Sequence, residues 1–331
     1  MTTAPASPLS EYIRRLPKTE THLHLEGALP WELLHRLDAN RFASPPASWA
    51  EHFRFSSFAH FEKELLDMAC AWYTSPERYH QAAKIIFQRH LAHNVRYVET
   101  SFASGVLQFL GLSGREVLQA ITEAVPRGLE VRVFLGIHHN GCTPAMQPVL
   151  EESITWPGLA GLDLHGDETL PLEDWARELW PAARAAGKYT KAHAGEFQGA
   201  GFVRQVIEEL GVQRIEHGAR AAEDPAVVRL AAERGIAFDL CPISNVKLGV
   251  APSLREHPLR RLRAAGVVCT ISTDDPISFG NTIQDDYEVL ARELAFTPAE
   301  LADLARAGFS VALVDEARRD QWRKEVDETR V

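Results

Sequence analysis

The stretch THLHLEG, residues 21–27, places two histidines, His22 and His24, one residue apart. On a β-strand, side chains two residues apart point to the same side, so both imidazoles would face inward while Leu23 and Leu25 pack outward. Two neutral imidazoles on one face supply half of a metal site, and the glycine that follows lets the chain turn above it. An isolated pair of this kind is more often a hydrogen-bonded or surface pair, so the interpretation depends on partners elsewhere.

Other candidate strands also end in side chains that bind metals or move protons. KAHAGE contains His193, a natural third ligand, and Glu196, which is placed to act as an acid or a base. The alternative there is a structural histidine followed by a glutamate at a helix N-terminus. RIEHG contains His217, and a histidine's ordinary pKa near neutrality suits proton transfer. LDLHGD adds three polar side chains, Asp163, His165 and Asp167.

The segment ISTDDP carries two adjacent carboxylates, Asp274 and Asp275, before a proline. Adjacent side chains diverge, so one can complete a metal shell while the other faces water or substrate. The alternative is that both carboxylates cap the turn that follows, since Asp-Pro often starts a loop.

Together these segments offer hard and borderline donors without a thiolate, a set that suits Zn²⁺ and also accepts Fe²⁺ or Mn²⁺. We predict one metal ion per chain, with an open position for water, whose pKa the metal lowers toward neutrality. Glu196, His217 and Asp275 would surround that water and the substrate, which indicates metal-assisted hydrolysis. The predicted ligands are His22, His24, His193 and Asp274.

Eight short apolar, β-branched segments alternate with helical patterns along the chain. This alternation predicts an α/β protein of the (β/α)8 TIM-barrel class, in which strand C-termini converge on one rim. The alternative is a doubly wound open sheet, but no glycine-rich phosphate fingerprint follows the first strand. The expected strands cover residues 21–27, 95–102, 130–139, 159–167, 189–196, 214–218, 236–242 and 267–275.

The chain reads as a single domain over residues 1–331, with a helical, aromatic-rich insert at about 30–94 after the first strand. We expect this insert to form a lid or wall on the barrel. Its phenylalanines are either plain core or an apolar wall over a planar ligand, with core favoured for most of them. They are Phe53, Phe55, Phe58 and Phe61.

The composition of the chain indicates which kinds of molecule it can bind. The chain carries 35 Lys+Arg against 45 Asp+Glu, a net charge of −10, which argues against binding a nucleic-acid backbone. No segment is apolar enough to predict a membrane span or a signal peptide, and the four scattered cysteines favour a reducing compartment. We therefore expect a cytoplasmic protein that acts on a small molecule; the sequence does not indicate its oligomeric state.

Six segments, in this order and spacing, resemble the adenosine deaminase family of the amidohydrolase superfamily: PKTETHLHLEG, GLDLHGDE, HAGE, RIEHG, CPISNVKL and STDDP. The resemblance runs from about residue 17 to residue 290. It implies hydrolytic deamination of a 6-aminopurine, with one Zn²⁺ on the four ligands named above. It further implies that His217 and Asp275 orient the attacking water and that Glu196 protonates ring N1. Gly166 would meet purine N3 through its backbone N–H, and Asp275 would also bind N7.

Different motifs of this chain resemble family members that act on different substrates. Glu26 stands where adenosine enzymes usually have an aspartate that touches the ribose 5′-hydroxyl, while RIEHG and CPISNVKL look closer to adenine deaminases. DDPISFGNTI is more similar to nucleoside-deaminating members. This mixture favours a purine nucleoside whose N9 substituent is not simply ribose, with aminodeoxyfutalosine ahead of adenosine. The alternative is free adenine.

Two other classes of function are consistent with the fold. One is a binuclear amidohydrolase that cleaves an amide or phosphoester, but the fourth strand lacks the bridging lysine such centres often need. The other is a non-catalytic relative, which is disfavoured because every expected catalytic position is filled.

Overall fold

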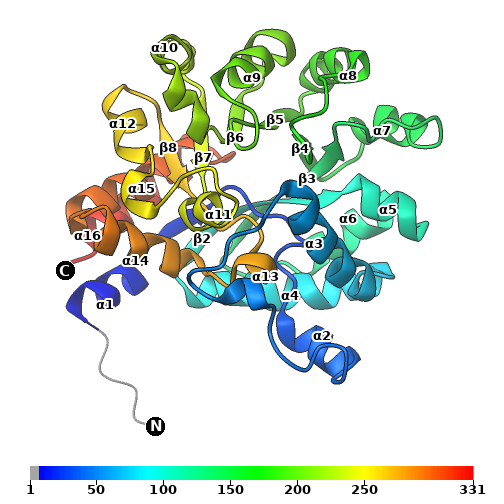
Figure 1. The fold of residues 1–331 in the computed structure, drawn as a ribbon, viewed down its shortest axis with the longest axis horizontal. Helices are drawn as coiled ribbons and strands as arrows, with labels where there is room; N and C mark the ends of the chain where they lie inside the picture. Colours follow the sequence, from blue (N-terminus) through cyan, green and yellow to red (C-terminus); the bar gives the residue numbers. More distant parts are fainter. Residues whose placement is uncertain (1–6, 331) are drawn as a thin grey trace.

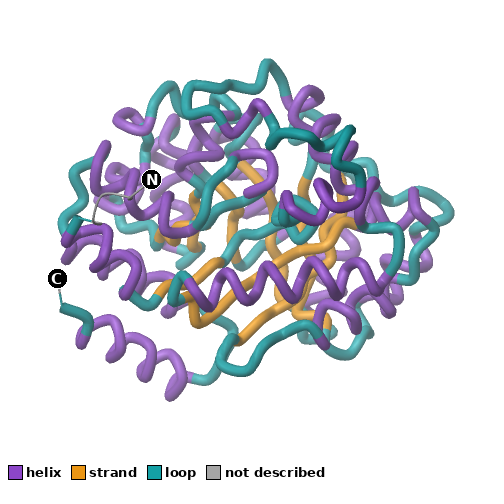
Figure 2. Tube along the Cα trace, turned by 90° about the horizontal axis from the view of Figure 1, so that it is seen from below, coloured by secondary structure: helices purple, strands orange, loops and turns teal. Residues whose placement is uncertain are grey.

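Eight parallel strands form the centre of the computed structural model, which describes residues 7–330 (Figure 1). Each strand is hydrogen-bonded to the next one along the chain, in the order β1 to β8, and helices surround them (Figure 2). This confirms the predicted (β/α)8 barrel. The strands are β1 (Lys18–Glu20), β2 (Val95–Ala103), β3 (Glu130–His138), β4 (Leu159–His165), β5 (Tyr189–Ala194), β6 (Arg214–His217), β7 (Ala237–Leu240) and β8 (Cys269–Ile271).

The helices pack their apolar faces on the strands, and local capping residues determine where each helix begins and ends. In α10, for example, the Asp224 side chain accepts a hydrogen bond from the Ala226 N–H and Pro225 occupies the first turn, where no N–H is needed. The helices are α1 (Pro8–Arg15), α2 (Trp31–Leu37), α3 (Phe58–Trp72), α4 (Pro76–Ala92), α5 (Ser104–Leu110), α6 (Gly114–Glu123), α7 (Gln147–Ser153), α8 (Asp174–Ala185), α9 (Ala200–Gln205), α10 (Pro225–Glu233), α11 (Pro242–Lys247), α12 (Leu259–Ala264), α13 (Pro276–Phe279), α14 (Ile283–Glu293), α15 (Pro298–Val311) and α16 (Glu316–Glu328). Four short turns of other helix types complete them: η1 (Ala47–Trp49), η2 (Val206–Leu210), η3 (Ala219–Glu223) and η4 (Leu254–Glu256).

The first strand begins and ends earlier than predicted. Regular pairing of β1 with β2 stops at Glu20, and beyond it the chain forms only isolated bridges, Leu23 to Asp274 and His24 to Ser101. The expected strand at 21–27 is therefore wrong in its bounds. The physical reason is that this stretch crosses the seam between β1 and β8, where side chains replace part of the backbone ladder.

Side-chain oxygens bind the free backbone N–H groups at that seam. The hydroxyl of Ser272 accepts hydrogen bonds from the N–H of Thr21 at 3.0 Å and of His22 at 3.1 Å. The carboxylate of Glu20 accepts from both the backbone N–H and the hydroxyl of Thr273, each at 2.9 Å. The seam therefore closes through polar side chains that are fully buried.

The segment predicted as an insert divides into two parts. Helix α4 packs on β2 and α6, so it belongs to the helical layer of the barrel. Helix α3 instead lies against α13 over the mouth of the barrel, together with α11 (Figure 1). The part that lies over the mouth is thus α3, with η1 also in contact with α13.

The C-terminal helix α16 forms where a solvated terminal helix was expected, but one face is buried through Trp322 and Val326. Across the residues that the structure describes, no helix combines the length and the apolar character needed to cross a membrane.

Candidate metal centre and active site

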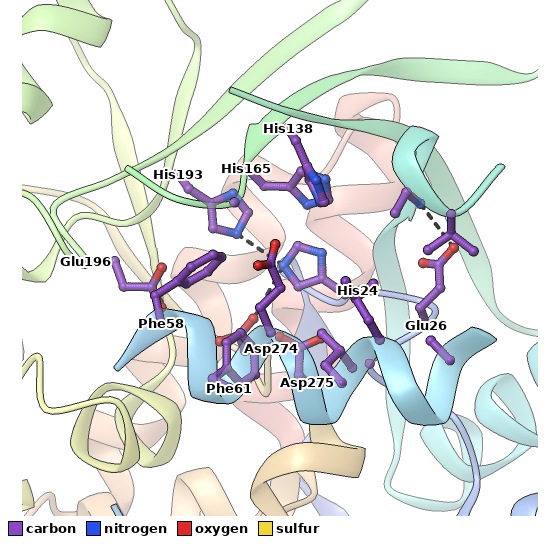
Figure 3. A pocket seen from close by; sticks show the side chains of 18 of the residues that line it. His24, Glu26, Phe58, Phe61, His138, His165, His193, Glu196, Asp274 and Asp275 are labelled. Carbon is purple, nitrogen blue, oxygen red and sulfur yellow. Dashed lines mark hydrogen bonds and ion pairs between the residues drawn. The ribbon is translucent and has the colours of Figure 1, made fainter. Parts of the chain in front are cut away.

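A cavity of about 70 Å³ lies at the carboxyl ends of the strands, beneath α3. Its wall includes His24, His193, Glu196 and Asp275 from the barrel, and Phe58 and Phe61 from α3 (Figure 3). The sequence positions that supply these side chains are far apart, and the parallel topology brings them to one rim.

The four predicted ligands point to a common centre. His24 Nε2 lies 3.1 Å from His193 Nε2 and 3.4 Å from His22 Nε2, and Asp274 Oδ1 lies 3.4 Å from both His22 Nε2 and His24 Nε2. Zinc bonds of about 2.0–2.1 Å in tetrahedral geometry place ligand atoms roughly 3.3–3.4 Å apart. The spacing of these atoms therefore fits one divalent cation between them.

The far side of each imidazole is held by another group, which leaves Nε2 directed at the centre. His24 Nδ1 lies 3.0 Å from the Ser101 hydroxyl, and His22 Nδ1 lies 3.3 Å from the Asp239 carbonyl. His193 Nδ1 lies within 3.2 Å of a set of acceptors, the Leu164 carbonyl and the Asp163 and Glu216 carboxylates. Outer contacts of this kind fix the tautomer and orientation of metal-binding histidines.

Asp274 adopts a left-handed backbone, φ 71°, which is rare for a residue with a side chain and is a feature of functional sites. Its Oδ2 accepts a hydrogen bond of 2.6 Å from the Ser244 hydroxyl, so Oδ1 is the oxygen that faces His22 and His24. Burial by itself would raise the pKa of Asp274, but hydrogen bonds from His22 and His24 hold it well below its usual range. The carboxylate is thus ionised, as a ligand must be.

A chain of hydrogen bonds fixes the tautomer of His217. The backbone N–H of Leu259 donates to His257 Nδ1 at 3.2 Å, so the proton of His257 is on Nε2, 3.0 Å from Asn245 Oδ1. The amide N–H of Asn245 then donates to His217 Nδ1, also at 3.0 Å. The His217 proton is consequently on Nε2, which faces Glu196 Oε1 at 3.3 Å. His217 is therefore a hydrogen-bond donor toward the cavity.

Glu196 is held in place by a second carboxylate, Glu168. The Glu168 side chain accepts hydrogen bonds from three consecutive backbone N–H groups, those of Glu196, Phe197 and Gln198, at 3.2, 3.0 and 2.7 Å. Burial raises the pKa of Glu196 well above its ordinary value, and the charges of Asp274 and Glu168 raise it further. Both effects favour the protonated, neutral form of Glu196.

Asp275 points into the cavity and depends on a glycine. A Cβ atom on Gly27 would lie 1.6 Å from Asp275 Oδ1, so a side chain there is incompatible with this carboxyl position. Oδ1 is buried and has no partner among the described residues. Burial and the adjacent Asp274 charge raise the pKa of Asp275 well above its usual range, which favours the protonated form that can donate a hydrogen bond.

The two remaining residues expected to bind substrate, Glu26 and Gly166, also line the cavity. Glu26 Oε1 accepts hydrogen bonds from the Tyr79 hydroxyl at 2.7 Å and the Ala103 N–H at 3.1 Å. Gly166 has φ +92° and lies against the His138 ring. Asp167, in contrast, binds Thr169 in a local turn.

The phenylalanine cluster serves both of the roles considered. Phe55 and Phe61 form a small core with Phe279, while Phe58 and Phe61 face the cavity. Phe61 and Phe279 are stacked, with ring centroids 5.5 Å apart.

Sequence reasoning assigned no role to several residues that shape the site. Ser244 and Asn245 are consecutive polar residues in the quoted segment CPISNVKL, and both are fully buried. Glu168 ends another quoted segment, GLDLHGDE. Adjacent polar residues after an apolar strand were the available signal, but their partners come from distant parts of the chain. His138 and His165, which also line the cavity, were left without a role as well.

Comparison with known proteins shows which family the chain resembles. Residues 17–329 match the adenosine deaminase family profile. The chain belongs to this family. It is 32% identical to an adenine deaminase of Cupriavidus necator, over 96% of this chain and 93% of the relative. An adenine deaminase of Streptomyces coelicolor is 30% identical, with 94% and 95% covered.

Solved structures agree on the fold of this adenosine deaminase family member. An adenine deaminase from Arthrobacter aurescens superposes with a TM-score of 0.84 at 24% identity, covering 95% of this chain and 98% of that one. An amidohydrolase from Burkholderia ambifaria, solved with bound Zn, gives a TM-score of 0.81 at 24% identity, covering 98% and 94%. The protein is a hydrolase of the purine deaminase type, and its buried His/Asp cluster could hold a metal ion.

Proposed function

We propose that this protein hydrolyses the 6-amino group of a purine nucleoside, releasing ammonia, with one Zn²⁺ held by His22, His24, His193 and Asp274. The observation that carries the proposal is the convergence of these four donor atoms at the floor of a cavity that also contains Glu196, His217 and Asp275.

The residues fit a zinc ion in donor type as well as in spacing. Three imidazole nitrogens and one carboxylate oxygen match the borderline character of Zn²⁺, and the outer hydrogen bonds keep each ligand atom free. When bound, the ion supplies an acidified water as the nucleophile.

Each of the surrounding side chains has its own role in the remaining steps of the reaction. Protonated Glu196 delivers a proton to ring N1 as water adds to C6, so negative charge does not accumulate on the ring. His217 donates from Nε2 to the attacking oxygen and orients it. Protonated Asp275 donates to N7, and Gly166 meets N3. As the bond between C6 and its amino group breaks, that nitrogen takes up the proton of the new C6 hydroxyl and leaves as ammonia, and the proton that the water gives up restores Glu196.

A second pocket beside the cavity favours the interpretation that the substrate is larger than a free base. A chamber of about 830 Å³ adjoins the inner cavity, and the two share wall residues. We infer that a substituent on N9 would extend from the purine site toward this chamber. We therefore favour a nucleoside, with aminodeoxyfutalosine ahead of adenosine. The shared residues are Glu62, Leu66, Val106 and His138.

Free adenine is the second candidate. It is favoured by the full-length relatives named adenine deaminase, with 30–32% identity for the two described above. The inner cavity is also small compared with the outer chamber.

Ammonia release with aminodeoxyfutalosine, adenosine and adenine, measured side by side on the zinc-loaded protein, tests the substrate. We expect a higher kcat/KM for both nucleosides than for adenine. A higher value for adenine would overturn the nucleoside proposal and support the second candidate.

The variant Glu196→Gln tests the chemistry. It keeps the shape of the side chain but removes the proton donor, so kcat should fall by roughly 10²–10⁴-fold. Zinc content, measured by metal analysis, should remain unchanged. Near-normal kcat in this variant would contradict the role given to Glu196.

A further inference from the structure

Two histidines outside the proposed metal centre form part of the cavity wall. His138 ends β3 and His165 ends β4, and they are register partners in neighbouring strands. Their ring centroids are 4.5 Å apart (Figure 3). None of the chemistry proposed above uses either side chain.

Glycines make room for both rings. A Cβ atom on Gly136 would lie 2.7 Å from the His165 ring, and Cβ atoms on Gly105 and Gly166 would lie 3.4 and 3.3 Å from the His138 ring. The first distance excludes a side chain at Gly136 unless the ring moves. The imidazole pair thus occupies space that the backbone leaves open for it.

The pair is polar and incompletely bonded. His165 is 7% exposed, and its Nε2 is buried with no hydrogen-bond partner among the residues described. Burial lowers the pKa of His138 to about 4, so this ring is neutral at pH 7. Each neutral imidazole offers one donor and one acceptor, a match for hydroxyl groups rather than for a charged partner.

In the purine orientation proposed above, an N9 substituent would extend toward this pair. N9 is at the opposite end of the purine from N1, which Glu196 would protonate. Glu196 follows β5, so His165 on β4 and His138 on β3 lie progressively farther round the barrel (Figure 3). His138 borders both the inner cavity and the outer chamber.

We propose that His138 and His165 form a subsite for a hydroxyl-bearing substituent, such as a sugar, on N9 of the purine. The inference rests on the proposed nucleoside deaminase function and assigns its substrate preference to these two side chains. They bind the substrate and take no part in proton transfer.

The test compares kcat/KM for adenosine, 2′,3′-dideoxyadenosine and adenine in the zinc-loaded wild type and in His138→Leu and His165→Leu. Loss of a hydrogen bond to a sugar hydroxyl should lower kcat/KM for adenosine roughly tenfold, mainly through KM. The value for adenine should change little. Dideoxyadenosine, which keeps only the 5′-hydroxyl, separates the two sugar positions: its value should change little if the pair binds the 2′- or 3′-hydroxyl and should fall with that of adenosine if the pair binds the 5′-hydroxyl. His138→Gln and His165→Gln, which retain a donor and an acceptor, should recover part of the loss and cover the case in which a leucine variant fails to fold.

His139→Leu is the matched control. His139 is next in sequence and fully buried, with both ring nitrogens unpartnered among the described residues, but its ring lies against Phe202 and outside the cavity wall. It should leave the ratio of adenosine to adenine turnover unchanged. Equal losses for all three substrates in the His138 and His165 variants, or none, would overturn the subsite while leaving the nucleoside proposal intact. A wild type that prefers adenine would overturn both.

Discussion

The proposed metal ligands and the other polar groups of the cavity differ in how completely they are bonded, since Asp275, which follows the ligand Asp274, also has a buried oxygen without a partner among the described residues. On the side of β1 and β8, the proposed ligands have defined partners: Ser101 for His24, Ser244 for Asp274, and Ser272 for the backbone at His22. On the side of β3 and β4, the ring of His165 has an unpartnered nitrogen. A buried polar group without a partner is costly, whereas a saturated network holds a fixed geometry. The difference agrees with our two proposals, a metal site among the bonded ligands and a substrate subsite at the unpartnered ring.

The largest effect is expected from a substitution among the proposed metal ligands. Asp274→Asn removes the anionic ligand, so zinc affinity should fall by more than roughly a hundredfold, beyond the usual cost of an outer-shell change. Activity should fall with it. Chelator competition and metal analysis measure the change. If both carboxylates only cap the turn, zinc content will not change.

Asp286→Asn is the matched control for that variant. Asp286 is an equally buried carboxylate that accepts hydrogen bonds from the Ile243 N–H and the Asn281 amide. It should affect stability but not zinc content.

The next effect concerns the tautomer of His217. In Asn245→Asp, the new carboxylate would accept from His257 and would also require a proton on His217 Nδ1, turning Nε2 from a donor into an acceptor. We expect kcat to fall roughly a hundredfold, since a wrong tautomer disables a positioned histidine. Zinc content should be unchanged. Unaltered kcat would show that donation from Nε2 is not needed.

A smaller effect is expected at the seam. Ser272→Ala removes the acceptor for the N–H groups of Thr21 and His22, so the chain that carries two ligands loses its anchor. Zinc affinity should fall roughly tenfold, as for other outer-shell changes. Ser48→Ala, which removes a buried hydroxyl without a partner among the described residues, is the control. An equal loss of affinity in the two variants would argue against a specific role for the seam.

At neutral pH the smallest effect is expected at His257, because its contribution to the pH dependence of stability appears only in acid. Burial lowers its pKa from 6.5 to about 3, so between these values the unfolded chain binds a proton that the folded protein does not. Folding free energy should therefore be lost as pH falls from about 6.5 toward 3. His257→Gln should show a shallower dependence in urea unfolding over this range. The same slope in both proteins would mean that other groups dominate.

The alternation of strands and helices was enough to predict the barrel, because hydrophobic periodicity and turn residues are local properties. The ligand types were also predictable, since His22 and His24 lie two residues apart and the other candidates fall at strand ends. The bounds of the first strand were not, because its pairing past Glu20 depends on Ser272, which lies far away in the sequence.

Sequence alone therefore determined which elements form and which residue types reach the rim of the barrel. Only the tertiary structure decided which nitrogen of His217 carries the proton, because that follows from a relay that begins at Leu259. It also decided that Gly27 and Gly136 must lack side chains, since Asp275 and His165 occupy the space. Both outcomes depend on atoms that are distant in the chain and meet only after folding, where burial makes each missing or extra contact costly.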